Sequence, residues 1–378
     1  MNNKEVNDPR KTLLNSNSDD LKESDEVEWL YCPFCGIKLP KVNKLKFCIG
    51  CGNDIDSLKN NRQLKPRRSI NPYIKSATFP QTSISSFFLG SKKISDEEII
   101  NPKNHELWGT QVSIGIPLGA FLLMNFISAG LLVLLTFFSF DINFLFDLVS
   151  NPYFLILSSF FELTFIILPV VYVEKYLQNP TLKNRLALLG FTSKGLNRHG
   201  LLKEIIIGLG FAFVGIILVG VVSFLTEIVV ELFFGIEIIR DINSAPTDVE
   251  IIISSADITS LILLSIVMIL IIGTSEEILF RGFMQKGLMR SLGNRWGIII
   301  TAFIFSIIHV LGFILMVLDS PLILFVSLLL SFFPYFMISL MLGLLFYWRN
   351  ENLIAVIIAH GVYDALAIIL AYLLYYTF

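Results

Sequence analysis

Three groups of polar side chains in the C-terminal half of the chain have the types and spacing of a hydrolytic site. They are, in chain order, Glu276, Glu277, Arg281, His309, His360 and Asp364. Each group lies in a stretch that is otherwise apolar enough to cross a bilayer, where a charged side chain costs about 2.5 kcal/mol or more. Because such groups usually face a protein interior and serve function, the pattern predicts one buried site.

The spacing within two of the groups indicates how they are divided. Glu277 and Arg281 are four residues apart on one helix face and can pair, whereas Glu276 projects about 100° away and can face another helix. A glutamate without an adjacent cation is suited to take a proton from water. His360 and Asp364 are also four residues apart, so the carboxylate can orient the imidazole or stand beside it as a ligand.

His309 has no polar partner on its own helix, and Phe305 precedes it by one turn. A lone histidine is more often a packed residue than a catalytic one, but a second histidine at similar depth weakens that interpretation. At a rise of 1.5 Å per residue from the nearest predicted loop, Glu276, His309, His360 and Asp364 lie about 12–21 Å deep. This shared depth is what a single buried site requires.

The composition indicates that these groups belong to a polytopic membrane protein. Hydrophobic residues make up 54% of the chain, charged residues only 16%, and the mean hydropathy is +0.69. We predict an all-α polytopic membrane protein of about seven to eight transmembrane helices with a small N-terminal zinc-ribbon module. The apolar runs place the spans near 110–140, 152–174, 203–230, 258–290, 295–318, 321–348 and 352–377. Pro321 and Pro334 leave room for an extra short helix between 311 and 348.

Loop charges predict the orientation of the spans. The 174–203 loop is rich in lysine and arginine, the 231–257 loop is acidic, and the remaining loops follow the same alternation. We therefore expect an integral, multi-pass protein with a cytoplasmic N-terminus, and we expect the plasma membrane as its location. Seven spans would place the C-terminus outside, and an eighth span would change the later assignments.

The four cysteines of the chain predict a structural zinc site. Cys32, Cys35, Cys48 and Cys51 form the pattern Cys-x2-Cys-x12-Cys-x2-Cys, which suits four thiolates around zinc. Four thiolates leave no open position for chemistry, and the cytoplasmic placement disfavours the alternative of disulfides. The resulting domain plan is a disordered polar tail (1–28), a four-cysteine zinc ribbon (29–56), a linker (57–108) and a transmembrane helical domain (109–378).

Basic side chains outnumber acidic ones between Lys38 and Lys75. Such a segment could suit anionic headgroups, an acidic partner or nucleic acid, but a solvated face and linker is the favoured interpretation. We expect a cytoplasmic protein partner for the ribbon, and we do not expect nucleic acid to be a partner.

Taken together, the three polar groups resemble the motifs of a known family. Glu276-Glu277-Ile-Leu-Phe-Arg281, Phe305-Ser-Ile-Ile-His309 and His360-Gly-Val-Tyr-Asp364 look like the EExxxR, FxxxH and HxxxN/D motifs of the CPBP family. That family includes type II CAAX prenyl endopeptidases and bacteriocin-immunity proteins. The resemblance covers about residues 200–378, and the ribbon and linker lie outside it.

This resemblance implies an intramembrane endopeptidase with a cavity open to the cytoplasm and to lateral lipid. It implies that Glu276 and His309 activate a water, that His360 and Asp364 stabilise the oxyanion, and that Glu277 and Arg281 support the site. Prenyl-endopeptidase members commonly have Asn where this chain has Asp364, and an ionised aspartate would repel an oxyanion. Asp364 could instead be protonated, hold His360 in one tautomer, or join a divalent metal, most simply zinc, in the membrane.

We therefore expect hydrolysis of a peptide bond in a membrane-associated substrate, prenylated proteins being one candidate class, by glutamate- and histidine-activated water. The alternative is a non-catalytic immunity or scaffold protein whose ribbon binds a cytoplasmic partner. A proton-coupled transporter ranks last, because the chain shows no evident inverted repeat.

Overall fold

A computed structural model of the protein describes residues 107–139, 142–193, 196, 198–243, 248–314 and 320–377. The predicted tail, the zinc ribbon with its four cysteines and nearly all of the linker lie outside these residues. The described part consists of helices, with no strand among them, which agrees with the predicted fold class.

Among the described residues, seven helical segments are long and apolar enough to cross a membrane, as expected from the sequence. They run over Thr110–Phe138, Pro152–Tyr176, Arg198–Phe234, Ile258–Leu292, Asn294–Leu311, Pro321–Trp348 and Ile354–Thr377. Every predicted span has a counterpart. The bounds differ most in the third span, where the helix begins and ends a few residues beyond the predicted range 203–230.

Five of the seven segments are single helices. These are α3 (Thr110–Ser139), α8 (Arg198–Phe234), α14 (Asn294–Ile314), α15 (Pro321–Trp348) and α16 (Ile354–Thr377). The other two change helical winding along their length. The second span comprises α5 (Pro152–Ser158), η2 (Ser159–Leu163), α6 (Thr164–Tyr172) and η3 (Val173–Tyr176). The fourth comprises α11 (Ile258–Val267), η4 (Met268–Ile272), α12 (Gly273–Glu277), η5 (Ile278–Gln285) and α13 (Lys286–Leu292).

Four short helices lie between the spans, and they are α4 (Ile142–Val149), α7 (Leu182–Leu188), α9 (Ile236–Asn243) and α10 (Asp248–Ser255). The extra helix allowed by the prolines does not form within the described residues. Pro321 occupies the first turn of α15, where its missing N–H costs nothing, and α15 continues as one helix through Pro334.

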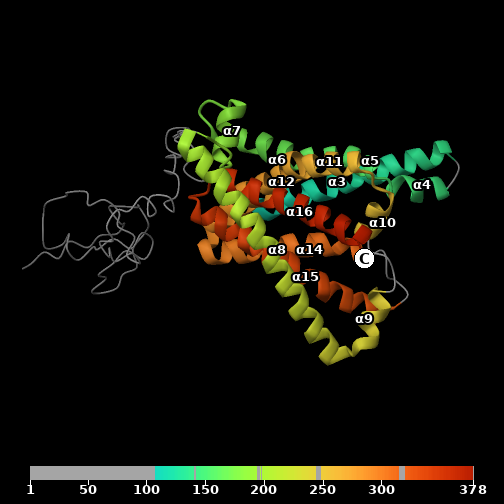
Figure 1. Ribbon diagram of the computed structural model, residues 1–378. Coiled ribbons are helices and arrows are strands. Elements are labelled where there is room, and N and C mark those ends of the chain that lie inside the picture. The colour runs from blue at the N-terminus through green and yellow to red at the C-terminus, as the bar shows by residue number, and fades with distance from the viewer. Residues whose placement is uncertain are drawn as a thin grey trace, which may run out of the picture. The chain divides into compact units, whose positions relative to one another are not determined.

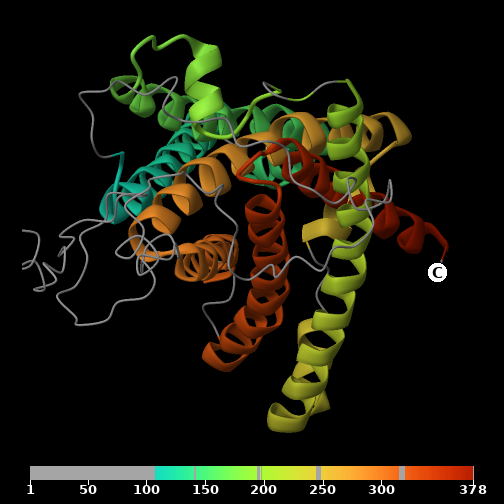
Figure 2. The same ribbon diagram turned by 90° about the vertical axis from the view of Figure 1, so that its left-hand side faces the viewer.

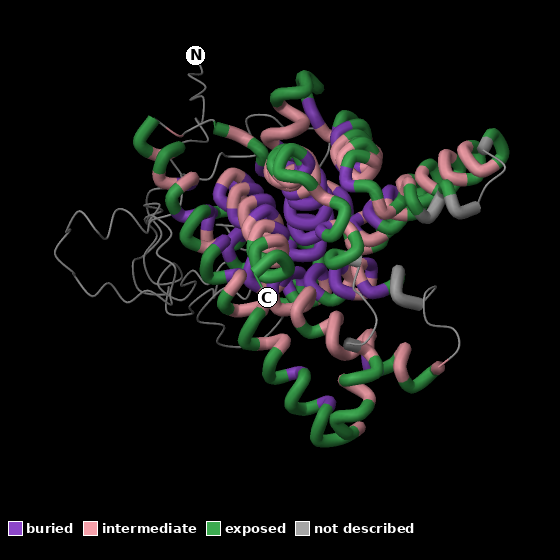
Figure 3. Tube along the Cα trace, turned by 45° about the vertical axis from the view of Figure 1, so that its right-hand side comes forward, coloured by how far each residue is buried: buried purple, intermediate pink, exposed green. Residues whose placement is uncertain are grey.

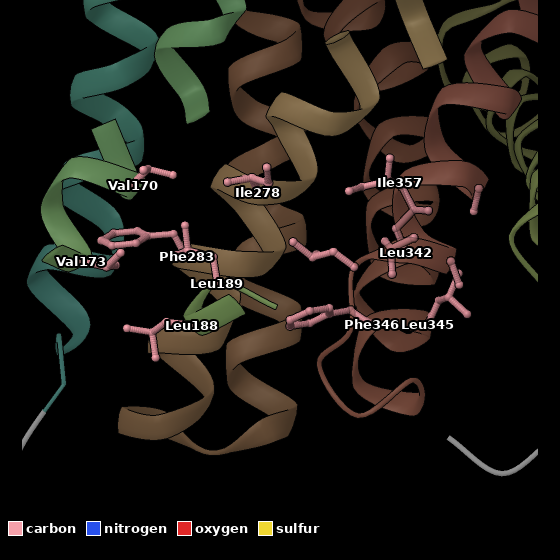
Figure 4. Close-up of a cluster of buried hydrophobic side chains, with 14 of the residues drawn as sticks. Val170, Val173, Leu188, Leu189, Ile278, Phe283, Leu342, Leu345, Phe346 and Ile357 are labelled. Atoms are coloured by element: carbon pink, nitrogen blue, oxygen red, sulfur yellow. The ribbon is translucent and has the colours of Figure 1, made fainter. Parts of the chain in front are cut away.

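The main hydrophobic core lies among the second, third, fourth, sixth and seventh spans and α7. Figure 4 shows part of this cluster, in which Phe283 of η5 lies near Leu189, while Leu342 of α15 lies near Ile357 of α16. Figure 3 shows the buried residues gathered in the middle of the bundle, while the C-terminal half of α8 is largely exposed. The core thus fixes the ends of α15 and α16 next to the fourth span.

Helix α8 has 37 residues, which is about 55 Å at 1.5 Å per residue and exceeds a hydrocarbon core of about 30 Å. It packs along α15 and α16, and α9 follows at its C-terminal end (Figures 1 and 2). A buried ion pair fastens its N-terminal part to the end of α15: Arg349 Nε lies 2.9 Å from Glu204 Oε2, and Arg349 Nη2 lies 2.5 Å from Glu204 Oε1. Both side chains are at most 1% exposed.

Candidate active site

The two adjacent glutamates lie on α12, which is a single α-helical turn between two π-helical segments, η4 and η5. π-Helical turns inside α-helices are rare and occur frequently at functional sites. Close backbone contact brings this turn against α16. A Cβ atom placed on Gly273 would lie 2.8 Å from the backbone N of Gly361, and one on Gly361 would lie 2.6 Å from Ile269 Cα. Two glycines therefore allow the glutamates to approach the histidine that precedes Gly361.

Glu277 is the centre of a buried polar network. Its Oε1 atom lies 2.7 Å from Arg281 Nη1, which confirms the predicted pair, and also 2.7 Å from His360 Nδ1. Arg281 Nη2 donates to Ser339 Oγ at 2.9 Å, so the network also includes α15. The side chains of Glu277 and Arg281 are fully buried. A buried charge is tolerated when it is paired and hydrogen-bonded, as both are here.

Glu276 lies between the two histidines. Its Oε1 atom is 3.7 Å from His309 Nε2, and its Oε2 atom is 3.7 Å from His360 Nε2. The Oε2 atom is buried and accepts no hydrogen bond from the described part of the chain. The prediction that Glu276 faces other helices is confirmed, and its carboxylate is left available for a water or a substrate group.

His309 is held in one orientation by its own helix and by α15. Its Nδ1 atom lies 2.9 Å from the carbonyl oxygen of Phe305, and because a carbonyl only accepts, Nδ1 carries the hydrogen. The ring stacks on Phe305 with centroids 4.1 Å apart and contacts Tyr335 at 4.8 Å. The lone pair on Nε2 of the neutral ring therefore faces Glu276.

Asp364 approaches the other nitrogen of His360. Its Oδ2 atom lies 3.4 Å from His360 Nε2, whereas Nδ1 is taken by Glu277. One of the roles considered from the sequence was that Asp364 holds His360 in one tautomer. In the structure the better hydrogen bond for that role belongs to Glu277, because only its oxygen lies within 3 Å of a ring nitrogen.

Sequence reasoning missed a further carboxyl, that of Glu162 in η2. Ser275 Oγ donates to Glu162 Oε2 at 3.3 Å, and Glu162 is close enough to Glu276, Asp364 and His360 to interact with them electrostatically. The signal was present, because an ionisable residue inside an apolar span is a candidate for function by the same rule that selected the other six.

Exposure within the site increases in one direction. Arg281 and Glu277 are fully buried and Glu276 is 11% exposed, while His360 is 6% and Asp364 23% exposed along α16. The more exposed edge thus lies toward the N-terminal end of the fourth span and the C-terminal end of α16. With the orientation that the loop charges predict, this edge faces away from the cytoplasm, which differs from the cytoplasmic opening implied by the resemblance.

The donor atoms do not converge on a metal position. In the part of the chain that the structure describes, no three or more His, Cys, Asp or Glu side chains have the arrangement needed to hold a metal ion. No metal-binding role is therefore assigned to these side chains.

Comparison with known proteins gives one match. Residues 258–366 match the family model described as type II CAAX prenyl endopeptidase Rce1-like, a shorter range than the 200–378 expected from the motifs. No curated protein and no solved structure matches the chain. The matched range contains all six predicted site residues and excludes Glu162. The part of the membrane domain that carries the site is thus similar to the Rce1-like CAAX proteases.

Proposed function

We propose that the protein is an intramembrane endopeptidase that hydrolyses a peptide bond of a membrane-associated substrate. The observation that carries this proposal is the position of Glu276, whose two oxygens face Nε2 atoms of histidines on two other helices at 3.7 Å each. A carboxylate between two imidazoles inside a membrane domain has a clear chemical use in hydrolysis. The similarity of residues 258–366 to a protease family supports the same activity.

Water activation is assigned to Glu276 and His309. Two acceptor atoms 3.7 Å apart can both hydrogen-bond one water, since each contact needs only about 2.8 Å. Glu276 takes the proton as the water oxygen attacks the carbonyl carbon, and the fixed Nε2 of His309 orients the same water. General-base catalysis of this kind contributes about 10²–10⁴-fold.

Oxyanion stabilisation is assigned to His360. Because Nδ1 donates to Glu277, a proton on Nε2 would make the ring a cation with a free donor beside the reacting carbon. The carboxylates of Glu277, Glu276 and Asp364 around this ring balance such a charge. Asp364 therefore acts through His360 in our proposal, and it does not need to donate to the oxyanion itself.

The remaining two residues position these groups. Arg281 neutralises Glu277 and anchors it to Ser339, and Glu277 in turn fixes the ring of His360. A catalytic histidine that is oriented by a buried carboxylate is a recurring device in hydrolases. Arg281 and Glu277 therefore act on the reaction through the position of His360.

The substrate class follows from the location of the site. The site lies on helices that are long and apolar enough to cross a membrane. We therefore propose a substrate that is anchored in or at the bilayer, and prenylated proteins are the class suggested by the family description. We also propose the plasma membrane as the location, with the N-terminus and a ribbon-binding partner in the cytoplasm, on the basis of the loop charges.

The zinc ribbon remains a separate proposal, because its residues are not described. We propose that Cys32, Cys35, Cys48 and Cys51 bind one structural zinc ion. Metal analysis of the full-length protein should find one zinc per chain, which is lost when Cys32 and Cys48 are replaced by serine. Retention of zinc in that variant would show that the metal is held elsewhere.

A comparison of membrane-protein C-termini tests the function in cells. Cells with the wild-type protein should contain shortened C-termini that are absent from cells with a Glu276→Ala variant of equal abundance. If no terminus differs and Glu276→Gln leaves the cellular phenotype intact, the non-catalytic immunity or scaffold alternative is favoured.

A further inference from the structure

Glu162 comes from a different part of the chain than the predicted site. It lies on η2 in the second span, outside the range that matches the protease family. Its only described hydrogen bond comes from the hydroxyl of Ser275, the residue that precedes Glu276. The electrostatic neighbours of its carboxyl include Glu276, Asp364 and His360. It therefore adds a third free carboxyl to the site.

In the described part of the chain, no lysine or arginine near Glu162 stabilises an ionised carboxylate at this position. No lysine or arginine lies within ion-pair distance among the described residues, whereas Glu277 is paired with Arg281 and Glu204 with Arg349. A partly buried carboxyl in an apolar span that lacks a cationic partner and adjoins other carboxylates favours the neutral acid. A neutral acid beside a reacting bond can donate its proton.

The reaction assigned to the site needs such a donor. The nitrogen of a peptide bond is a poor leaving group unless it is protonated as the bond breaks. The proposed water lies between Glu276 Oε1 and His309 Nε2, whereas Glu276 Oε2 faces His360 Nε2. The contact between Glu162 and Ser275 brings a second carboxyl from the second span to the helical turn that carries Glu276.

We propose that Glu162 is the general acid of the reaction, and this inference rests on the proposed endopeptidase function. Glu276 accepts a proton from water, and the hydroxide oxygen bonds to the carbonyl carbon. When the carbon–nitrogen bond breaks, the carboxyl of Glu162 transfers its proton to the nitrogen. Proton transfer through solvent from Glu276 to Glu162 then returns Glu276 to the carboxylate and Glu162 to the acid. The net reaction converts water and the amide into a carboxylic acid and an amine.

The test compares two leaving groups. The probes are a synthetic peptide that spans a Glu276-dependent cleavage site and the same peptide with a thioester in place of the scissile amide. A thiol with an ordinary pKa of about 8.5 leaves without protonation. We expect Glu162→Gln to lower kcat about 100-fold on the amide, with KM nearly unchanged, and to hydrolyse the thioester at close to the wild-type rate.

Two variants serve as references for Glu162→Gln. Glu276→Gln should lose both activities, because both substrates need the activated water. Glu227→Gln removes an exposed carboxyl from α8 and should keep both. Ser275→Ala removes the hydroxyl that contacts both Glu162 and the Ile272 carbonyl oxygen. It should reduce amide hydrolysis by a few-fold and spare the thioester, and it replaces Glu162→Gln if that variant does not fold.

Three results would overturn the inference. Unchanged amide hydrolysis by Glu162→Gln would remove any role for this carboxyl, and an equal loss on amide and thioester would show a structural role. Either result leaves the proposed function standing when Glu276→Gln is inactive. If no cleavage depends on Glu276, the proposed endopeptidase function is wrong, and the general-acid role of Glu162 is then wrong as well.

Discussion

The Oε1 atom of Glu277 lies 2.7 Å from Nδ1 of His360, and the same oxygen accepts a hydrogen bond from Arg281. The contact spans 83 residues of sequence and connects α12 with α16. It sets the direction in which Nε2 of His360 points, namely toward Glu276 and Asp364. The arginine of the EExxxR pattern therefore contributes to the position of the second histidine without touching it.

This relationship predicts the effect of Glu277→Gln. The amide keeps the size of the carboxylate but removes the charge that balances Arg281 and orients His360. We expect kcat to fall by about 10- to 100-fold, the range known for loss of a residue that orients a metal-bound histidine, with little change in KM. Steady-state kinetics of the purified variant measure this split, and a rise in KM at constant kcat would contradict it.

The close approach of η4 and α12 to α16 predicts that Gly361→Ala damages the site. The added methyl group would lie 2.6 Å from Ile269 Cα and 2.9 Å from the carbonyl oxygen of Met268, both in η4, so α16 must move away from the fourth span. Overpacking of this kind costs about 1–3 kcal/mol, and we expect loss of activity together with a lower thermal midpoint in detergent.

Gly210→Ala is the matched control for Gly361→Ala. A Cβ atom at Gly210 has nothing within 4 Å, so this substitution in α8 should leave activity unchanged and stabilise the helix slightly. Equal behaviour of the two variants would show that the close approach of η4 and α12 to α16 is not required.

The buried pair of Glu204 and Arg349 predicts a contrast between single and double substitutions. Removal of one partner leaves an unpaired buried charge, which costs about 3–5 kcal/mol. Glu204→Leu or Arg349→Met alone should therefore lower the thermal midpoint strongly, and the double variant should recover much of the loss. Glu237 and Arg240 form an exposed pair, so Glu237→Gln should change the midpoint little. A double variant as unstable as both singles combined would contradict this account.

The exposure gradient predicts the side from which the site is reached. Tyr335 contacts His309 near the middle of α15 and is partly exposed. A thiol introduced as Tyr335→Cys should react with a membrane-impermeant maleimide in intact cells. Lys183→Cys in α7, on the predicted cytoplasmic side, should react only after permeabilisation, and the native cysteines are distinguished by peptide mapping. Labelling of the Tyr335→Cys variant only after permeabilisation would support the cytoplasmic opening instead.

The spans and the gathering of the six predicted polar residues could be predicted from the sequence because both depend on strong local signals. Long apolar runs have few alternatives to transmembrane helices, and charged residues within them must gather where they can be paired. The pairing of Glu277 with Arg281 follows from helical periodicity alone. The convergence of Glu276, His309 and His360 was expected from their similar depth.

The partners across helices could not be predicted in the same way. The sequence places Asp364 one turn from His360, where it could orient the imidazole or stand beside it as a ligand. In the structure Glu277 of α12, which lies between two π-helical segments, makes the short contact with the His360 ring instead. Likewise, nothing local connects Glu162 with Ser275, since 113 residues separate them and only the packing of η2 against the fourth span brings them together.

The central claim is that Glu276 activates the water that cleaves a peptide bond. The most direct test measures cleavage of a membrane-anchored substrate by purified, reconstituted wild-type protein and by Glu276→Ala, with folding checked by gel filtration and thermal midpoint. We expect the wild type to release a C-terminal fragment and the folded Glu276→Ala variant to release none. Equal release by the two folded proteins would contradict it.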